Sequence, residues 1–277
     1  MSTQSFQINH TDGRAPSLAD AELFLLDMDG TFYLDNRLLP GAQDFLRICK
    51  DLGVRYTFVT NNSSKSPQAY IEKLEHMGVY ISSAEILTSG DATLMWMEDQ
   101  GLGRDILLIG TESLEAQFAE RGYHLDAPSP CLVVLGFDTS LTYQKLTALC
   151  DAVRSGIPYI ATHADLNCPT ADGYIPDIGA TIAFVEASTG RRPDVILGKP
   201  NGLIAQAAAR RADVPLERLC MVGDRLYTDI ALGQCGVLTA LVLTGESTLE
   251  DLRDSPYRPD FVFQGLLEMG EALRQLP

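Results

Sequence analysis

The sequence predicts an α/β protein in which helices cover a parallel sheet, because strand-like and helix-like segments alternate along the chain. Apolar runs at 23–26 and 56–59 have the length of buried strands. Residues 42–52 and 67–77 carry apolar side chains at helical spacing, and a glycine follows each of these two segments. The four segments together describe the beginning of a parallel sheet with its covering helices.

The middle of the chain predicts a second, smaller α/β domain. Strand-like runs lie at 106–109, 132–135 and 159–161, and they alternate with helical segments at 114–121 and 143–154. The same alternation of strand and helix therefore starts a second time within the chain.

The last part of the chain is expected to return to the larger domain. It contains strand-like runs at 195–197, 219–222 and 240–243, with a helical segment at 200–211. We predict one core domain from residues 1–88 and 191–277, with residues 89–190 inserted into it as the smaller domain. Residues 1–20 are polar and are expected to form a loose leader.

The acidic charge of the chain argues against one class of partner. Its 37 acidic and 21 basic residues give a formal net charge of −16, which repels a polyanion such as DNA at long range. Nucleic acid is therefore not an expected partner. A small phosphorylated molecule stays an acceptable substrate, because a local cation site outweighs the overall field at contact distance.

The cysteines and the apolar segments indicate a cytoplasmic protein. The six cysteines are scattered without a C-x-x-C pair, so we expect reduced core residues rather than a disulfide framework or a zinc site. No apolar run approaches the roughly 20 residues that span a bilayer. The start of the chain lacks the pattern of a signal peptide, so we expect neither a membrane segment nor export.

Two acidic residues stand directly after the first predicted strand. Burying Asp27 and Asp29 there without a cation or a proton is costly, so their position needs an explanation. A metal ion could hold Asp27 while Asp29 shares a proton with a leaving group, which gives a nucleophile and a general acid/base. Gly30 then lets the backbone turn tightly under a ligand. An ordinary polar turn explains these residues equally well.

Polar residues also follow the second predicted strand and begin a later helix. Thr60 and Asn61 end that strand, where hydroxyl, amide and backbone N–H groups can face an anion. Lys199 lies at a predicted helix start, which is an unfavourable place for a cation unless an anion lies beside it. Turn and capping residues, and an exposed lysine without a role, are the ordinary alternatives.

A second pair of acids completes the pattern. Asp224 follows the strand predicted at 219–222, and Asp229 lies five residues further on. An acidic N-cap would explain one of them as easily as metal binding does. In an open parallel sheet these strand ends line one crevice, where ligands bind. The motifs together offer one anion-binding half and one metal-binding half, as phosphoryl transfer requires.

With these motifs the sequence resembles the haloacid dehalogenase superfamily of phosphatases, and within it the NagD-like, 4-nitrophenylphosphatase-like subclass IIA. The family's four motifs occur in order as Asp27-Met28-Asp29-Gly30-Thr31, Thr60-Asn61, Lys199, and Gly223-Asp224 with Asp229. The insertion between the second and third motifs matches the α/β cap of this subclass in position and size. The resemblance implies a Rossmann-like parallel sheet core with an inserted smaller α/β cap domain.

The resemblance also implies the chemistry: a Mg²⁺-dependent phosphatase that hydrolyses small-molecule phosphate monoesters through an aspartyl-phosphate intermediate. Asp27 would attack phosphorus and bind the metal. Asp29 would protonate the leaving oxygen, activate water and touch the metal through its backbone carbonyl. Asp224 would be the second carboxylate ligand, with Asp229 ligating directly or through water.

The remaining roles implied by the resemblance concern the substrate. Thr60 and Asn61 would hold the phosphoryl oxygens, and Lys199 would neutralise Asp27 and the transferring group. Two residues of the cap depart from the family pattern: His163 stands where asparagine is frequent, and Asp177 replaces a usual glycine. Both are candidate substrate-binding residues.

Two other functions share these residues. A phosphomutase would use the same two aspartates and return the phosphoryl group to a second position of the substrate, whereas a catalytically idle sensor would bind a phosphorylated ligand without turnover. Sugar phosphates, nucleotides, phosphoglycolate and pyridoxal phosphate all fit the predicted substrate class. The family often forms homodimers through the cap, so the resemblance allows such a dimer, and the sequence itself leaves the oligomeric state open.

Overall fold

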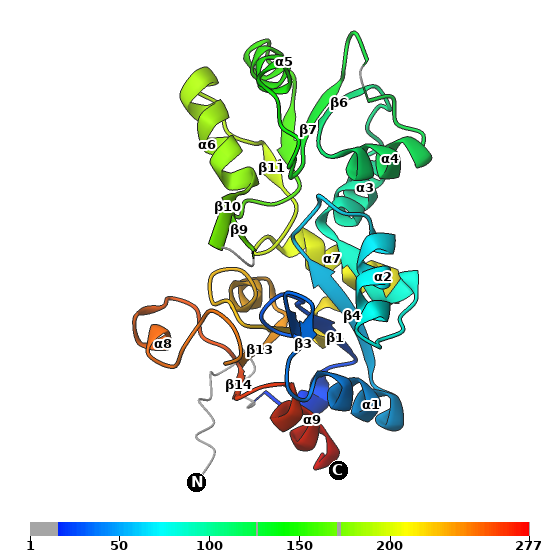
Figure 1. Cartoon of the computed structure of the whole chain (residues 1–277), viewed down its shortest axis with the longest axis vertical. Helices are drawn as coiled ribbons and strands as arrows, with labels where there is room; N and C mark the ends of the chain where they lie inside the picture. The colour runs from blue at the N-terminus through cyan, green and yellow to red at the C-terminus, as the bar shows by residue number, and fades with distance from the viewer. Residues whose placement is uncertain (1–15, 126, 171–172, 277) are drawn as a thin grey trace. The chain divides into compact units, whose positions relative to one another are not determined.

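The computed structural model describes residues 16–125, 127–170 and 173–276 (Figure 1). Residues 1–15, which make up most of the predicted leader, lie outside the described residues. The rest of that segment includes a short 3-10 helix, η1 (Leu18–Asp20), with Ser17 as its N-cap.

Contacts between residues divide the chain into two compact units. Unit 1 contains the described residues of Met1–Val59, Ile71–Leu87 and Lys199–Pro277, and unit 2 contains those of Thr60–Tyr70 and Thr88–Gly198. The domain limits that the sequence predicts, with a cap at 89–190, stay a prediction.

A six-stranded sheet in the order β14-β13-β12-β1-β4-β5 forms the centre of unit 1. Its strands are β1 (Leu23–Leu26), β4 (Arg55–Thr60), β5 (Ile86–Thr88), β12 (Leu219–Gly223), β13 (Leu238–Val242) and β14 (Phe261–Phe263). Strand β1 pairs in parallel with β12 and β4, with Leu26 opposite Val222 and Phe58. Every residue of β1 and β12 is buried, which explains their continuous apolar sequences. The predicted parallel sheet is thus confirmed.

Helices α1 (Ala42–Leu52) and α9 (Leu266–Arg274) pack against each other beside this sheet (Figure 1). Gly270 allows their close approach, because a Cβ atom there would lie 2.6 Å from Cδ1 of Ile48. The other elements of unit 1 are β2 (Tyr33–Leu34), β3 (Arg37–Leu38), η2 (Ser83–Glu85), α7 (Gly202–Ala212), η3 (Leu216–Arg218), η4 (Ile230–Cys235) and α8 (Asp251–Asp254).

Helix α2 (Pro67–His76) begins among the residues of unit 2 and ends among those of unit 1. The helices predicted at 42–52, 67–77 and 200–211 are confirmed to within two residues by α1, α2 and α7. In the described part of the chain, no helix combines the length and the hydropathy that crossing a membrane requires.

Unit 2 has its own parallel sheet of four strands in the order β11-β8-β7-β6. The strands are β6 (Ile106–Ile109), β7 (Leu132–Leu135), β8 (Tyr159–Ala161) and β11 (Val195–Ile196). Helices α5 (Tyr143–Arg154) and α6 (Ile178–Thr189) lie on one side of it, and α3 (Ser89–Asp99) and α4 (Glu112–Glu120) lie on the other (Figure 1). An antiparallel hairpin of β9 (Asn167–Thr170) and β10 (Gly173–Pro176) precedes α6.

One predicted strand joins a different sheet from the one expected. The run at 195–197 was expected to return the chain to the larger sheet, but β11 pairs with β8 in unit 2, with Val195 opposite Ile160. That expectation was wrong, because so short an apolar run fits the edge of either sheet equally well.

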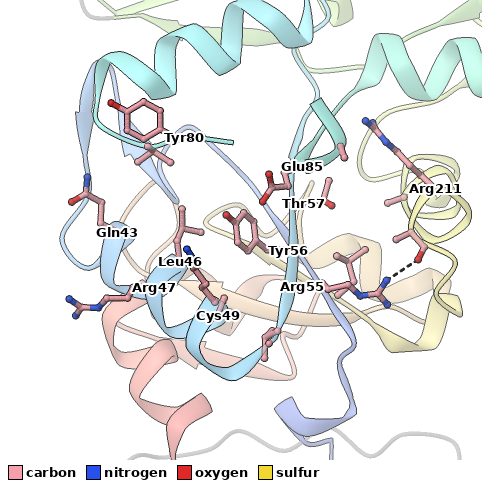
Figure 2. Close-up of a pocket in the computed structure, with 18 of the residues that line it drawn as sticks. Gln43, Leu46, Arg47, Cys49, Arg55, Tyr56, Thr57, Tyr80, Glu85 and Arg211 are labelled. Carbon is pink, nitrogen blue, oxygen red and sulfur yellow. Dashed lines mark hydrogen bonds between the residues drawn. The ribbon is translucent and has the colours of Figure 1, made fainter. Parts of the chain in front are cut away.

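A pocket of about 1050 Å³ lies in unit 1 where β1 and β4 begin, at the edge opposite the residues that follow these strands (Figure 2). Two of its cations have backbone partners: Arg55 donates to the carbonyl oxygen of Ala212 at 3.0 Å, and Arg211 to that of Ile86 at 2.8 Å. Cations near the C-terminal ends of helices are favourable without any ligand. These contacts therefore explain the two arginines without a ligand in the pocket.

Candidate active site

Two aspartates follow neighbouring strands of the large sheet. Asp27 comes directly after β1, and its backbone N–H donates to the carbonyl oxygen of Val222 in β12 at 2.9 Å. Asp224 comes directly after β12. Because β1 and β12 are parallel neighbours, their carboxyl ends bring both aspartates to one edge of the sheet.

A buried lysine connects two of the carboxylates. Lys199 is only 3% exposed, and its Nζ donates to Oδ1 of Asp27 and to Oδ1 of Asp229, the latter at 2.7 Å. Burial alone would lower the pKa of Lys199, but the charges of Asp229 and Asp27 outweigh it and raise that pKa above its usual value. The lysine is therefore held as an ammonium ion against both carboxylates.

The three carboxylates could together hold a metal ion. Ligand oxygens of Asp27, Asp224 and Asp229 all lie within 4.8 Å of one another. Burial raises the pKa of Asp224 to about 6 and that of Asp229 to about 7, and the charge of Asp27 adds to both shifts. Hard carboxylate oxygens at this spacing are the donors that Mg²⁺ prefers, so the residues present fit such an ion.

A loop after β13 fixes Asp224, and the sequence reasoning missed it. The backbone N–H of Glu246 donates to Oδ2 of Asp224 at 2.7 Å, and Oγ1 of Thr31 donates to Oδ1 at 3.1 Å. Gly245 leaves no space for a side chain, because a Cβ atom there would lie 2.0 Å from Oδ2 of Asp224. The available signal was a glycine shortly after an apolar strand.

Asp29 lies beside this cluster in the sequence, but its side chain is not one of the three clustered carboxylates. It accepts a hydrogen bond from Oη of Tyr33 at 3.3 Å. Burial raises the pKa of Asp29, although the cation of Lys73 works in the opposite direction. A raised pKa keeps a carboxyl group protonated at higher pH, which suits a proton donor.

The polar pair after β4 belongs to unit 2 by its contacts. Thr60 is the last residue of β4, and its Oγ1 accepts the backbone N–H of Asn62 at 3.2 Å. Nδ2 of Asn61 donates to both carboxylate oxygens of Asp165, at 3.1 and 3.2 Å. The second predicted motif is thus tied to the segment that follows β8.

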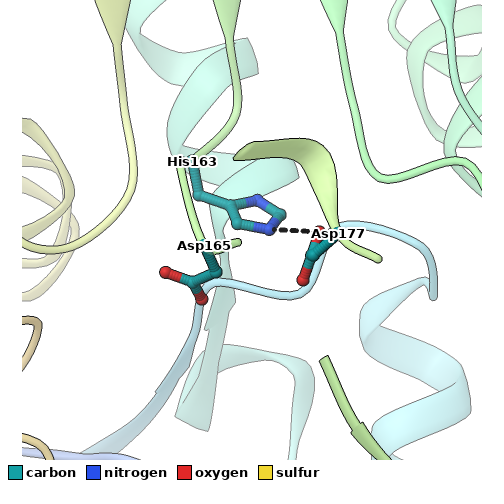
Figure 3. Close-up of side chains that lie close together, drawn as sticks. All are labelled: His163, Asp165 and Asp177. Carbon is teal, nitrogen blue, oxygen red and sulfur yellow. Dashed lines mark hydrogen bonds and ion pairs between the residues drawn. The ribbon is translucent and has the colours of Figure 1, made fainter. Parts of the chain in front are cut away.

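The two residues that depart from the family pattern, His163 and Asp177, lie side by side in unit 2, as Figure 3 shows. Nε2 of His163 lies 3.0 Å from Oδ1 of Asp177, and both side chains are buried. Asp177 is also the N-cap of α6 and accepts the backbone N–H of Ile178. The carboxylate of Asp165 lies within 4.8 Å of this pair. Sequence reasoning singled out both residues but did not predict that they form a pair.

Family models match both ends of the chain. The model described as haloacid dehalogenase-like hydrolase matches residues 24–124, and a HAD-hydrolase-like model matches residues 196–269. Among curated relatives, the 5'-nucleotidase YutF of Bacillus subtilis is 34% identical over 246 residues, which are 88% of this chain and 96% of the relative. The acid sugar phosphatase of Staphylococcus aureus is 34% identical over 260 residues, which are 91% and 97% of the two chains.

The chain belongs to the haloacid dehalogenase-like hydrolase family. Among solved structures, a 4-nitrophenylphosphatase from Thermotoga maritima is similar with a TM-score of 0.89 and 48% identity, covering 92% of this chain and 98% of that one. NagD from Escherichia coli K-12 is similar with a TM-score of 0.83 and 30% identity, covering 90% and 98%. The family resemblance that the motifs indicated is confirmed, and the chain is a phosphoric monoester hydrolase.

Proposed function

We propose that this phosphatase hydrolyses phosphate monoesters of small molecules through an aspartyl-phosphate formed on Asp27, with Mg²⁺ as its cofactor. The observation that carries the proposal is the buried contact of Lys199 with Asp27 and Asp229. A buried ammonium ion beside a carboxylate that follows a sheet strand supports that carboxylate as a nucleophile toward an anionic phosphoryl group.

The proposed reaction has two steps. A carboxylate oxygen of Asp27 attacks phosphorus, the bond to the ester oxygen breaks, and Asp29 gives its proton to the departing oxygen. A water molecule then attacks phosphorus, Asp29 takes the proton of that water, and the bond to Asp27 breaks. Lys199 stabilises the negative charge on Asp27 and on the transferring group in both steps.

Asp27, Asp224 and Asp229 would hold the Mg²⁺ ion, with the backbone carbonyl of Asp29 as a further ligand. Three carboxylates gather around the ammonium of Lys199, and a divalent cation would neutralise the negative charge that the lysine leaves uncompensated. When bound, the ion supplies compensation for the negative charge of the phosphoryl group.

The residues of unit 2 complete the proposal on the substrate side. Thr60 and Asn61 would bind the phosphoryl oxygens, because they offer a hydroxyl, an amide and backbone N–H groups. His163 and Asp177 are assigned to substrate choice. The names of the relatives, a 5'-nucleotidase and an acid sugar phosphatase, favour nucleotides and sugar phosphates as the first substrates to test. A homodimer through the cap and a cytoplasmic location stay predictions.

Covalent labelling tests the mechanism. The enzyme is mixed with Mg²⁺ and a sugar phosphate carrying phosphorus-32, quenched in acid, and the label on the protein is counted. We expect acid-stable, hydroxylamine-sensitive label on the native protein, and none on Asp27→Asn. Asp44→Asn, which alters a carboxylate on α1 away from the strand ends, is the matched control and should label normally. Turnover in deamidation-free Asp27→Asn, or labelling at another residue, would refute the aspartyl-phosphate.

A further inference from the structure

A buried tyrosine lies against the proposed proton donor. Tyr33 is fully buried at the start of β2, and its backbone carbonyl accepts the N–H of Gly30 at 2.9 Å. This turn brings the ring back to Asp29, whose Oδ2 accepts a hydrogen bond from Oη of Tyr33 at 3.3 Å. No hydrogen bond from the described residues reaches Oδ1 of Asp29. The two oxygens of this carboxyl group therefore have different surroundings.

A lysine from helix α2 contacts the ring of the same tyrosine. Nζ of Lys73 in α2 lies 3.7 Å from the centre of the Tyr33 ring, a cation–π contact. Lys73 is half-buried, which strengthens its electrostatic effect compared with a fully solvated lysine. The same cation attracts the negative charge of Asp29. The tyrosine thus contacts the carboxyl group through its hydroxyl and the cation through its ring.

We propose that Tyr33 and Lys73 are positioning residues for Asp29. The hydroxyl group of Tyr33 binds Oδ2, and Lys73 contacts the tyrosine ring and attracts the carboxylate, so that Oδ1 exchanges the proton with the leaving group and with water. This inference rests on the proposed role of Asp29. In the first step, the proton leaves Oδ1 for the ester oxygen as the phosphorus–oxygen bond breaks. The hydrogen bond of Tyr33 to Oδ2 and the charge of Lys73 then stabilise the carboxylate that forms. In the second step, Oδ1 takes the proton back from water.

The burial of the tyrosine makes the arrangement specific. A buried hydroxyl group that loses its acceptor pays the cost of desolvation, so the Tyr33 hydroxyl and the Asp29 carboxyl group restrain each other. An exposed hydrogen bond would compete with water and would position Asp29 far less.

The dependence of rate on the leaving group tests this role. A nitrophenolate ion departs without a proton, whereas an alkoxide needs one. The values of kcat/KM, which report the first step, are measured for 4-nitrophenyl phosphate and for glycerol 1-phosphate. In Tyr33→Phe, which keeps the ring, we expect about a tenfold loss for the alkyl ester and less than about twofold for the nitrophenyl ester. Tyr159→Phe, which removes a buried hydroxyl without a hydrogen-bond partner in the described structure, should change neither.

The lysine is tested in the same assay. Lys73→Met should show the same selective loss on the alkyl ester, and Lys73→Arg should restore most of it, because arginine retains the charge and the contact with the ring. Lys50→Met, which changes an exposed lysine on α1, is the matched control. Melting temperatures of all variants show whether any loss comes from unfolding.

Asp29→Asn separates the failure of this inference from failure of the proposed function. If Asp29→Asn lowers kcat/KM equally for both esters, Asp29 is not the proton donor and the proposed function is wrong at that residue. If Asp29→Asn discriminates between the esters but Tyr33→Phe and Lys73→Met lower both equally or change neither, the positioning role is overturned alone. Selective loss in all three variants supports both.

Discussion

Nε2 of His163 and Oδ1 of Asp177 lie 3.0 Å apart in the interior of unit 2, and these are the two residues that depart from the family pattern. Burial of both side chains strengthens this hydrogen bond, because water does not compete for either partner. Nδ1 lies 3.1 Å from Oγ1 of Thr162, which completes the partners of the imidazole ring. His163 and Asp177 therefore form one hydrogen-bonded pair.

We expect the pair to be coupled in stability. His163→Asn and Asp177→Gly, which restore the residues frequent in the family, should each lower the free energy of unfolding by about 2–3 kcal/mol, because each leaves a buried polar partner unsatisfied. The double variant should recover at least about 1 kcal/mol relative to the sum of the single losses. Urea unfolding of the four proteins measures this coupling. Additive losses would show that the two residues act independently.

The edges of the sheet were predictable, whereas the loops that fix the site were not. Asp27 and Asp224 follow strands whose apolar sequences mark them, and parallel neighbours bring such residues together. The close contact of Gly245 with the carboxylate of Asp224 and the hydrogen bond from Tyr33 to Asp29 depend on loop geometry, which has no periodic signal in the sequence. The sheet predicted for the strand at Val195 was wrong for a related reason, since two apolar residues do not specify which sheet a strand joins.

Metal removal is expected to abolish activity. Asp27, Asp224 and Asp229 are hard oxygen ligands. Asp224 and Asp229 are buried and their pKa values are raised, so the site is unfavourable without a cation. Phosphate release should vanish with a chelator and return with Mg²⁺. Asp224→Asn should raise the Mg²⁺ concentration needed for half activity at least tenfold. Full turnover by thoroughly stripped protein would contradict the prediction.

Gly245→Ala should impair the metal site more than the fold. A Cβ atom at this position would lie 2.0 Å from Oδ2 of Asp224, a side chain held by two hydrogen bonds, so the carboxylate must move. We expect the Mg²⁺ affinity, measured by calorimetry, to fall about tenfold or more. Gly233→Ala is the matched control, because its new Cβ atom meets Thr239 at 3.3 Å, away from the carboxylates. Equal Mg²⁺ affinities in both variants would show that the close contact at Gly245 does not position Asp224 for the metal.

Substrate choice is expected to reside in the segment around the buried pair, while the chemical step resides at the strand ends. His163 and Asp177 are buried, so their effect on a substrate would pass through the neighbouring Asp165, which is partly exposed and is held by the amide of Asn61. His163→Ala and Asp177→Gly should each change the ranking of good substrates by about a hundredfold or less, on the order of 1–3 kcal/mol for a lost polar contact. Asp165→Asn, which keeps the shape and removes the charge, should change the same ranking. Hydrolysis of 4-nitrophenyl phosphate should change little in all three, because a small ester makes few contacts beyond the phosphoryl group.

Values of kcat/KM over a broad panel of sugar phosphates and nucleotides test this prediction, with the exposed Asp151→Asn on α5 as the control. An unchanged ranking, or an equal loss on every ester, would place specificity elsewhere in the chain.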